Sequence, residues 1–530
     1  MTSSPDHPAP EPSPRSPVAV PGRGPAAAGA GAGWTAPAAQ GPGTPAASFL
    51  APDRRARPAW LGVGRPADWR VLVAAAVAGV LTDIALRGGG AGVGGALLIA
   101  ALAAGLLGAG RLRTRQAWLL AAAAPVFGIW LALRTSPWLL PLDVIAALGL
   151  LVLAAGLARG GSVWDLPAAR LVVRGGAAVW HALAAPGYLG GAVAVDRRGG
   201  RAALAGIALA VPVVVVLGAL LASADPVFAS FFDVGQFTGH LALFVLGAWL
   251  AGGLLRTAAA AAVPDLRVNA RWLDPVAVLV VLGAIDVLFA AFAVAQLIAL
   301  GEGGARVLET AGLTYAEYAR SGFFQLLAVA ALTVVTLLAL RAWTRDPDGP
   351  ARRRLLAFQV TAVVLILALV VVAVRRLGLY TGEFGLTMLR LYSSLFSVWV
   401  GVVVVLLGLA VVGVGRGRHW LGPVGGAAGL AILLGLNLAN PEALVVRHNL
   451  ARPEAAGGDG LDAAYVGSLS DDAVPAAAAA LDDLDAAARA RVLDQLGCAA
   501  RDTPASGWAA ANLARFRADL ARSEVCDASL

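Results

Sequence analysis

Carboxylates inside long apolar segments are the residues of this sequence best placed to do chemistry. Asp286 lies in the middle of one such segment, Asp143 lies a turn or two into another, and Asp83 lies near the end of a third. A charged side chain is unfavourable within a membrane, so such carboxylates usually face a partner or a water-filled path. Each could therefore bind a proton or a cation. The alternative is a structural carboxylate that is protonated or paired with Arg.

A second candidate is the Asp225-Pro226 pair, which closes the outer end of another apolar segment. Proline disfavours helical geometry in the residue before it, and an Asp in that position can cap the element that follows. A helix stop explains the motif without any chemistry, and the alternative is a re-entrant site on the outer face.

The two cysteines, Cys498 and Cys526, both lie near the C-terminus. If this region is extracytoplasmic, they can form a disulfide. The alternative is two independent buried thiols.

Other chemistry is excluded by what the sequence lacks. All 41 basic residues are Arg, so a Walker A loop and a Lys Schiff base are ruled out. The five His are scattered, and no H-E-x-x-H, C-x-x-C or G-x-S-x-G motif occurs. We therefore expect no catalytic residue, no cofactor and no metal centre. The Arg residues form short clusters without a basic stripe and interleaved aromatics, which argues against nucleic acid as a partner.

The elements that must position these residues are membrane helices. Hydrophobic residues make up 58% of the 530-residue chain and charged residues only 14%, far from the balance of a soluble protein. A helix needs about 20 residues to cross a bilayer. The sequence predicts an all-α polytopic bundle of about eleven spans in the lipid bilayer, at 70–87, 91–110, 116–134, 138–158, 202–222, 239–262, 274–300, 321–342, 355–376, 392–414 and 420–438.

Three regions frame and interrupt this bundle, which occupies residues 59–438. Residues 1–58 are rich in Pro, Ala and Gly, which predicts a disordered cytoplasmic segment. Residues 162–201 mix apolar and charged side chains with Trp, typical of an amphipathic segment in the membrane interface. Residues 439–530 alternate acids with Ala, Leu and Val at helical spacing and predict a small helical tail, with Trp508, Leu513, Phe516 and Leu520 between two antiparallel helices.

The distribution of Arg predicts the orientation in the plasma membrane. Alternate connections, counted from the N-terminal side, contain 24 Arg, and the opposite connections contain seven. Since Arg is enriched on the cytoplasmic side, we expect a cytoplasmic N-terminus and, with eleven spans, an extracytoplasmic C-terminus. The connection 375–391 departs from this pattern because it places three Arg outside.

Several stretches of the chain form a recognisable set: Leu220–Ala229, Gly322–Leu327, Leu389–Tyr392, Leu436–Leu444, Arg447–Asn449 and Trp508–Asn512. They resemble an uncharacterised bacterial polytopic membrane family, catalogued as domain of unknown function 4173. The resemblance implies an integral membrane protein without assigned catalytic residues.

These observations leave three hypotheses for function. The first is a non-enzymatic envelope membrane protein with the outer tail as an interaction or sensing module. The second is a secondary transporter or ion pathway that uses Asp286. The third, a membrane enzyme, is disfavoured because no Asp, His or Arg cluster marks one membrane face. The sequence identifies no protein partner.

Overall fold

The computed structural model is helical through the residues that it describes, which confirms the all-α prediction. Backbone pairing between extended residues is limited there to two isolated bridges. The predicted disordered segment 1–58 and the predicted span 202–222 lie outside this described part, apart from Val213 and Leu217. The described residues lie between 61 and 527. The longer gaps are 64–66, 194–233 (within which Val213 and Leu217 are described), 261–270, 301–322, 453–461 and 497–506. Shorter gaps lie at 88, 90–91, 166–167, 346, 348 and 416–418.

Apolar helices occupy the other ten predicted spans. In the described part of the chain, eight helices are long and apolar enough to cross a membrane, with α3 and α4 counted as one, and α2 and α5 are shorter at 17 residues each. The chain is thus a multi-pass membrane protein. Its apolar helices are α1 (Trp69–Arg87), α2 (Val93–Ala109), α3 (Arg115–Gly128), α4 (Trp130–Leu133), α5 (Leu140–Gly156), α10 (Val234–Ala259), α11 (Pro275–Leu300), α14 (Phe323–Trp343), α15 (Gly349–Phe384), α16 (Met388–Val412) and α17 (Leu421–Ala439).

These helices are apolar on their outer faces as well as on their packed ones. On α11, Leu282 is fully buried, whereas Val287 and Leu288 are 71% and 65% exposed. A helix that is hydrophobic all round is typical of a membrane span, in which exposed Val and Leu contact lipid acyl chains.

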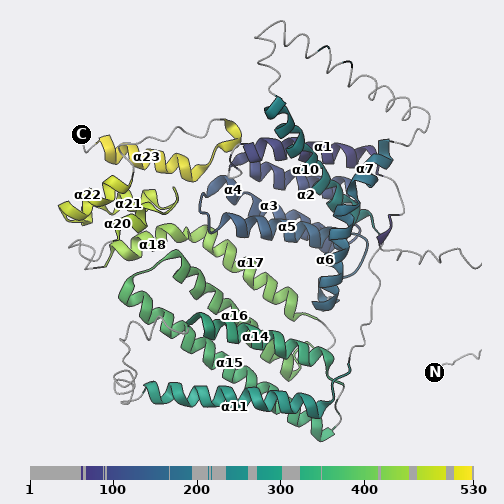
Figure 1. Cartoon of the computed structure of the whole chain (residues 1–530), viewed down its shortest axis with the longest axis vertical. Helices are drawn as coiled ribbons and strands as arrows, with labels where there is room; N and C mark the ends of the chain where they lie inside the picture. The colour runs from purple at the N-terminus through teal and green to yellow at the C-terminus, as the bar shows by residue number, and fades with distance from the viewer. Residues whose placement is uncertain are drawn as a thin grey trace, which may run out of the picture. The chain divides into compact units, whose positions relative to one another are not determined.

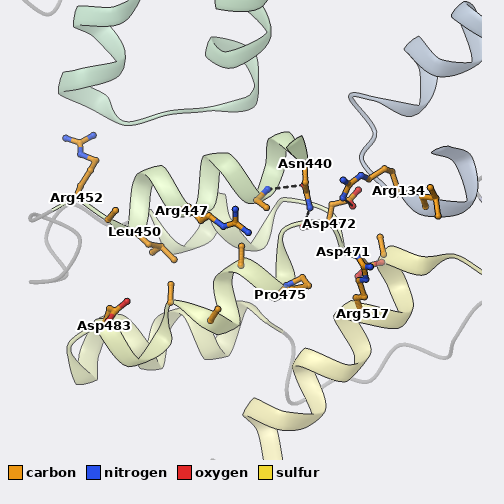
Figure 2. Close-up of a pocket in the computed structure, with 17 residues that line it drawn as sticks. Arg134, Asn440, Arg447, Leu450, Arg452, Asp471, Asp472, Pro475, Asp483 and Arg517 are labelled. Atoms are coloured by element: carbon orange, nitrogen blue, oxygen red, sulfur yellow. Dashed lines mark hydrogen bonds and ion pairs between the residues drawn. The ribbon is translucent and has the colours of Figure 1, made fainter. Parts of the chain in front are cut away.

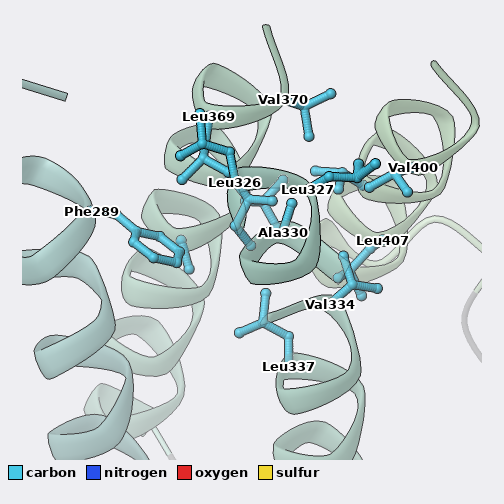
Figure 3. Close-up of a cluster of buried hydrophobic side chains, with 14 of the residues drawn as sticks. Phe289, Leu326, Leu327, Ala330, Val334, Leu337, Leu369, Val370, Val400 and Leu407 are labelled. Carbon is cyan, nitrogen blue, oxygen red and sulfur yellow. The ribbon is translucent and has the colours of Figure 1, made fainter. Parts of the chain in front are cut away.

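The helices pack in two groups (Figure 1). The first group shares a core that includes Leu106 of α2, Leu151 of α5 and Leu255 of α10. The second group, α11, α14, α15 and α16, packs around a separate core, part of which is shown in Figure 3. Helix α17 contacts α16 of the second group and α5 of the first, so it links the two.

Close packing within the first group depends on small residues. A Cβ on Gly79 of α1 would lie 2.7 Å from the ring and carbonyl of Phe244 on α10. Small residues let membrane helices approach closely, and this contact accounts for a glycine inside α1.

Helix α15 corrects the sequence prediction at one connection. It has 36 residues and continues to Phe384, well beyond the predicted end at 376. Arg376 donates a hydrogen bond to Gln296 Oε1 of α11 at 3.0 Å, and Arg390 stacks 4.1 Å from the ring of Tyr380. The three Arg predicted to lie in one long connection therefore belong to helices α15 and α16.

The predicted interfacial segment is helical where it is described. It contains a short 3-10 turn (Val163–Asp165), α6 (Ala168–Leu183) and α7 (Ala185–Val193). Helix α6 packs against α10, and the indole of Trp180 donates a hydrogen bond to Leu61 O at 3.2 Å. Its depth in the membrane interface stays a prediction.

Helices after Asn440, here called the tail helices, have a core of their own. Helix α21 packs against α18 and α23, and α20 packs against α22. Val446, Val466, Leu481 and Val492 are among the buried side chains of this core. The tail helices are α18 (Pro441–Leu450), α20 (Ala463–Gly467), α21 (Val474–Ala479), α22 (Ala486–Gln495) and α23 (Leu513–Asp527), with 3-10 turns at η3 (Leu481–Asp483) and η4 (Trp508–Ala510).

The packing of α23 differs from the prediction. Trp508, Phe516 and Leu520 were expected between two helices, but they are 57%, 60% and 49% exposed. Instead, Ala514 and Ala518 form the buried face of α23. Small side chains let α23 approach α21 closely, which leaves the large side chains on the opposite face.

Candidate functional site

The end of helix α4 meets the tail helices through Arg134. The chain becomes extended at this residue, and its guanidinium contacts two distant segments. Nε and Nη2 donate to the backbone carbonyl of Asn437 at 3.0 and 2.6 Å, and Nη1 donates to Asp472 Oδ1 at 3.1 Å. The last carbonyls of a helix have no partner inside the helix, so a cation here stabilises the end of α17.

Both carboxylate oxygens of Asp472 accept hydrogen bonds. Its side chain is only 1% exposed, and Oδ2 accepts hydrogen bonds from the backbone N–H groups of Thr135 and Ser136 at 2.8 and 3.0 Å. With Arg134 on the other oxygen, this buried charge is both paired and hydrogen-bonded, the condition under which burial of a charge is tolerated.

Asn440 places α18 relative to Asp472. Its φ of +55° ends α17, and Asn tolerates this left-handed conformation better than most residues. The side-chain oxygen accepts from Ala443 N at 3.1 Å and caps α18, where Pro441 occupies the first turn. The side-chain nitrogen donates to Asp472 O at 2.8 Å, so the cap also holds the segment before α21.

Asp143 joins this network from within the first helix group. It is fully buried in the first turn of α5, and its Oδ1 accepts a hydrogen bond from Asn437 Nδ2 at 2.7 Å. Asn437 thus links Asp143 to Arg134, because its amide contacts Asp143 and its carbonyl contacts Arg134.

Glu442 is a third buried carboxyl, on α18 outside the membrane-spanning helices. It is 1% exposed, and its Oε2 accepts from the backbone N–H and the hydroxyl of Ser470 at 2.7 and 2.6 Å. Burial raises the pKa of Glu442 above its ordinary value, and the hydrogen bonds from Ser470 only partly oppose this rise. The negative charge of Asp472 raises this pKa further.

Five buried polar atoms of this region have no hydrogen-bond partner among the described residues. The hydroxyl of Tyr392 on α16 lies close enough to Asp143, Glu442 and Asp472 to interact with their negative charges when they are ionised. The hydroxyls of Ser136 and Tyr392 can donate as well as accept, whereas an amide oxygen and an ionised carboxylate can only accept. The five atoms are Asp143 Oδ2, Ser136 Oγ, Tyr392 OH, Asn437 Oδ1 and Glu442 Oε1. We call the whole set of side chains the polar joint: Arg134, Ser136, Asp143, Tyr392, Asn437, Asn440, Glu442, Ser470 and Asp472.

Next to the polar joint lies a cavity of about 720 Å³, here called the arginine pocket. Alanines of α18, α21 and α23, with Leu133, Leu450 and Pro475, form its apolar walls. In Figure 2, Arg134 lies at one end of this pocket, and Arg452 and Asp483 lie at the other. Its charged lining residues are Arg134, Arg447, Arg452, Arg517, Asp471, Asp472 and Asp483.

The predicted carboxylates have three different environments. Asp143 lies in the polar joint. Asp83 is paired with Arg87 at 3.0 Å and with His240 at 2.6 Å. Asp286 is 7% exposed on α11, and neither of its carboxylate oxygens has a hydrogen-bond partner among the described residues. Asp225, Pro226 and Cys498 lie outside the described part of the chain, whereas Cys526 lies near the end of α23.

Sequence reasoning missed most of the polar joint. Arg134 and Asp472 were not singled out, and their pairing gives no local signal because 338 positions separate them. Asn437, Asn440 and Glu442 do carry a signal. An Asn-Pro-Glu sequence directly after an apolar helix predicts a helix end followed by a capped helix start, and three polar residues there favour a site.

Side chains that could bind a metal ion do not cluster in the part of the chain that the structure describes. Across the described residues, no three His, Cys, Asp or Glu side chains are grouped closely enough to hold one.

Together these features define an α-helical, multi-pass membrane protein with a buried polar joint between its bundle and its tail helices. Residues 117–480 match the model of one family, described as a domain of unknown function (DUF4153). The chain therefore belongs to the DUF4153 family. This corrects the resemblance to family 4173 and keeps its implication of an uncharacterised membrane protein. No curated protein and no solved structure matches the chain.

Proposed function

We propose that this chain is a non-enzymatic envelope membrane protein whose tail helices act as a sensing and interaction module. The observation that carries the proposal is the bond of Arg134 to both Asp472 and Asn437 O. Through it, the tail helices are connected to α5 and α17 by buried polar contacts. A ligand or partner that shifts the tail helices must then alter contacts at two helices of the bundle.

Five further hydrogen bonds support coupling between tail and bundle. Val93 N donates to Ala511 O at 3.0 Å, and Asn512 Nδ2 donates to the carbonyls of Leu131 and Arg134 at 2.9 and 2.8 Å. Leu386 exchanges two hydrogen bonds with the side chain of Asn449, both at 2.7 Å. The tail helices thus contact the starts of α2 and α16 as well as the end of α4.

The proposed orientation is a cytoplasmic N-terminus and an extracytoplasmic tail. The connections that touch the tail helices are ones that the Arg distribution assigns to the outer side, including those around Arg134 and Leu386. In this arrangement the sensing module faces the outside of the plasma membrane.

Hydrogen–deuterium exchange on the full chain in lipid nanodiscs tests the coupling. Replacing Arg134 by Met should increase amide exchange in α5 and α17 as well as in the tail helices, because both ends of the connection lose a partner. The matched control is Arg489→Met, since Arg489 forms an ion pair with Asp482 on the surface of the same region. An increase confined to the tail helices would show that they move independently, and it would overturn the sensing role.

A second candidate function is a proton or cation pathway through Asp286. The observation in its favour is that this carboxyl is buried in a membrane helix without a hydrogen-bond partner among the described residues. Unpaired carboxylates at mid-membrane positions mark proton and ion pathways in many transporters.

Proton flux into proteoliposomes tests this candidate. If Asp286 carries protons, Asp286→Asn should abolish flux while expression and thermal stability are unchanged. Asp274→Asn is a suitable control, since Asp274 is exposed at the start of the same helix and caps Val276 N. Flux that persists in the Asp286 variant, or is lacking in the wild type, would leave this residue with a structural role only.

A further inference from the structure

The arginine pocket has an excess of uncompensated positive charge. Asp472 is occupied by Arg134, and Asp471 is paired with Arg522 at 2.9 Å. Arg447 and Arg517 line the pocket, and neither guanidinium forms a hydrogen bond or ion pair with a described residue. Asp483 at the far end supplies one negative charge. Two guanidiniums on different helices therefore face a cavity that holds too few carboxylates to neutralise them.

The shape of the arginine pocket favours a ligand with an apolar part as well as a charge. Its volume of about 720 Å³ falls in the range typical of small-molecule sites. Leu133, Leu450 and Pro475 contribute apolar surface beside the guanidiniums. Leu133 is the last residue of α4, so the pocket opens near the end of a membrane-spanning segment.

We propose that the arginine pocket binds a phosphate group, held between Arg447 of α18 and Arg517 of α23. Guanidiniums present planar, paired N–H donors that match phosphate oxygens, and such charge-assisted hydrogen bonds are stronger than neutral ones. The phosphate belongs either to an anionic lipid headgroup or to a soluble phosphate ester. Figure 2 shows both arginines within the same pocket, on separate helices.

This inference rests on the proposed sensing function, because it names the ligand that the module senses. Arg134 provides the connection, since it lines the pocket and also contacts Asn437 O, whose side chain contacts Asp143. A phosphate that also binds Arg134 would compete with Asp472 for the Arg134 guanidinium and would weaken the polar joint. Binding and its transmission are separate properties and are measured separately.

Binding is tested on the purified full chain in nanodiscs. One set contains phosphatidylcholine with phosphatidylglycerol, and retained anionic lipid is counted by native mass spectrometry. The other contains phosphatidylcholine alone, and glycerol phosphate is titrated by intrinsic tryptophan fluorescence. In whichever nanodisc set the wild type binds its ligand, the double variant Arg447→Gln/Arg517→Gln should weaken binding at least roughly tenfold. The reason is that it removes two charge-assisted contacts.

Two controls separate a site from general charge. Arg489→Gln/Arg491→Gln removes the same charge from α22 outside the pocket and should leave binding unchanged. Arg447→Lys/Arg517→Lys keeps the charge and should recover only part of the affinity, because an ammonium cannot form the paired contacts.

The outcomes test the phosphate site and the sensing function separately. Retention of lipid identifies a headgroup site, and response to glycerol phosphate identifies a soluble ligand; either supports the inference. No binding in both arms, or equal loss in the α22 control, overturns it. If the wild type binds but exchange in α5 and α17 does not change with ligand, the phosphate site stands and the sensing function fails.

Discussion

Arg134 and Asp472 form an ion pair at 3.1 Å across 338 positions of sequence, between the end of α4 and the segment before α21. The pair is almost fully enclosed, with side-chain exposures of 13% and 1%. It also carries hydrogen bonds to Asn437 O, Thr135 N and Ser136 N. Removing either partner therefore leaves a buried charge and several backbone groups without a partner.

Arg134→Met is expected to destabilise the protein by about 3–5 kcal/mol, the usual cost of breaking a buried ion pair. Thermal unfolding in nanodiscs measures the loss, and Arg134→Met/Asp472→Asn should recover part of it because no charge is left unpaired. Arg489→Met is the control, and its loss should be under about 1 kcal/mol because Asp482 is 90% exposed. Equal effects of Arg134→Met and Arg489→Met would mean that the Arg134 pair adds no more than a surface contact.

Stability should fall as pH rises above the ordinary Glu pKa of 4.5, through Glu442. Burial raises the pKa of Glu442 in the folded state, so the folded chain holds this proton more tightly than the unfolded one. The contribution is complete below the unfolded pKa and is lost as pH rises through the folded pKa.

Unfolding measured across a pH series checks this dependence. Glu442→Gln keeps the hydrogen-bond geometry but cannot ionise, so its curve should be flatter than that of the wild type in this window. Glu524→Gln on α23 provides the control, because Glu524 is exposed. A wild-type curve parallel to that of Glu442→Gln would exclude Glu442 as the cause.

The sequence predicted the membrane helices well for a simple physical reason. Each is an apolar run long enough to cross a bilayer, and that property is local. The end of α15 was missed because Arg375, Arg376 and Glu383 suggest a loop. In the structure, Arg376 binds Gln296 of α11, and such a tertiary partner cannot be found from local composition.

The site was predictable only in part, for the same reason. Asp143 stood out because a carboxylate in an apolar run is anomalous by itself. Asp472 did not stand out, because acids are common in a polar helical tail. Its role depends on Arg134, and one sequence contains no information on which of 41 arginines it meets.

The orientation prediction is tested by a reporter that is active only in the cytoplasm. Fused after Leu530, it should be inactive, because the Arg distribution places the tail outside. Fused within the 343–349 connection, which lies on the opposite side in the predicted topology, it should be active. Strong activity after Leu530 would mean that the number of spans differs by one from the prediction.

The disulfide between Cys498 and Cys526 is the remaining prediction, and it depends on an extracytoplasmic tail. Cys526 lies in the last turn of α23, whereas Cys498 lies outside the described residues. Helices α22 and α23 are already connected near this point, because Arg522 Nε donates to Leu496 O at 3.2 Å. Leu496 is two positions before Cys498 in the sequence, so the last described residue before Cys498 contacts α23.

Thiol labelling of unreduced, denatured protein taken directly from the membrane should detect no free thiol. Cys526→Ser should then expose one thiol and destabilise the tail helices by about 3–4 kcal/mol, the loop-closure contribution expected for a crosslink of this span. Ser523→Ala on the same helix is the control, since it alters a side chain on α23 without affecting any thiol. Two labelled thiols in the wild type would disprove the disulfide and weaken the argument for an outer tail, because an oxidising compartment would be expected to join them.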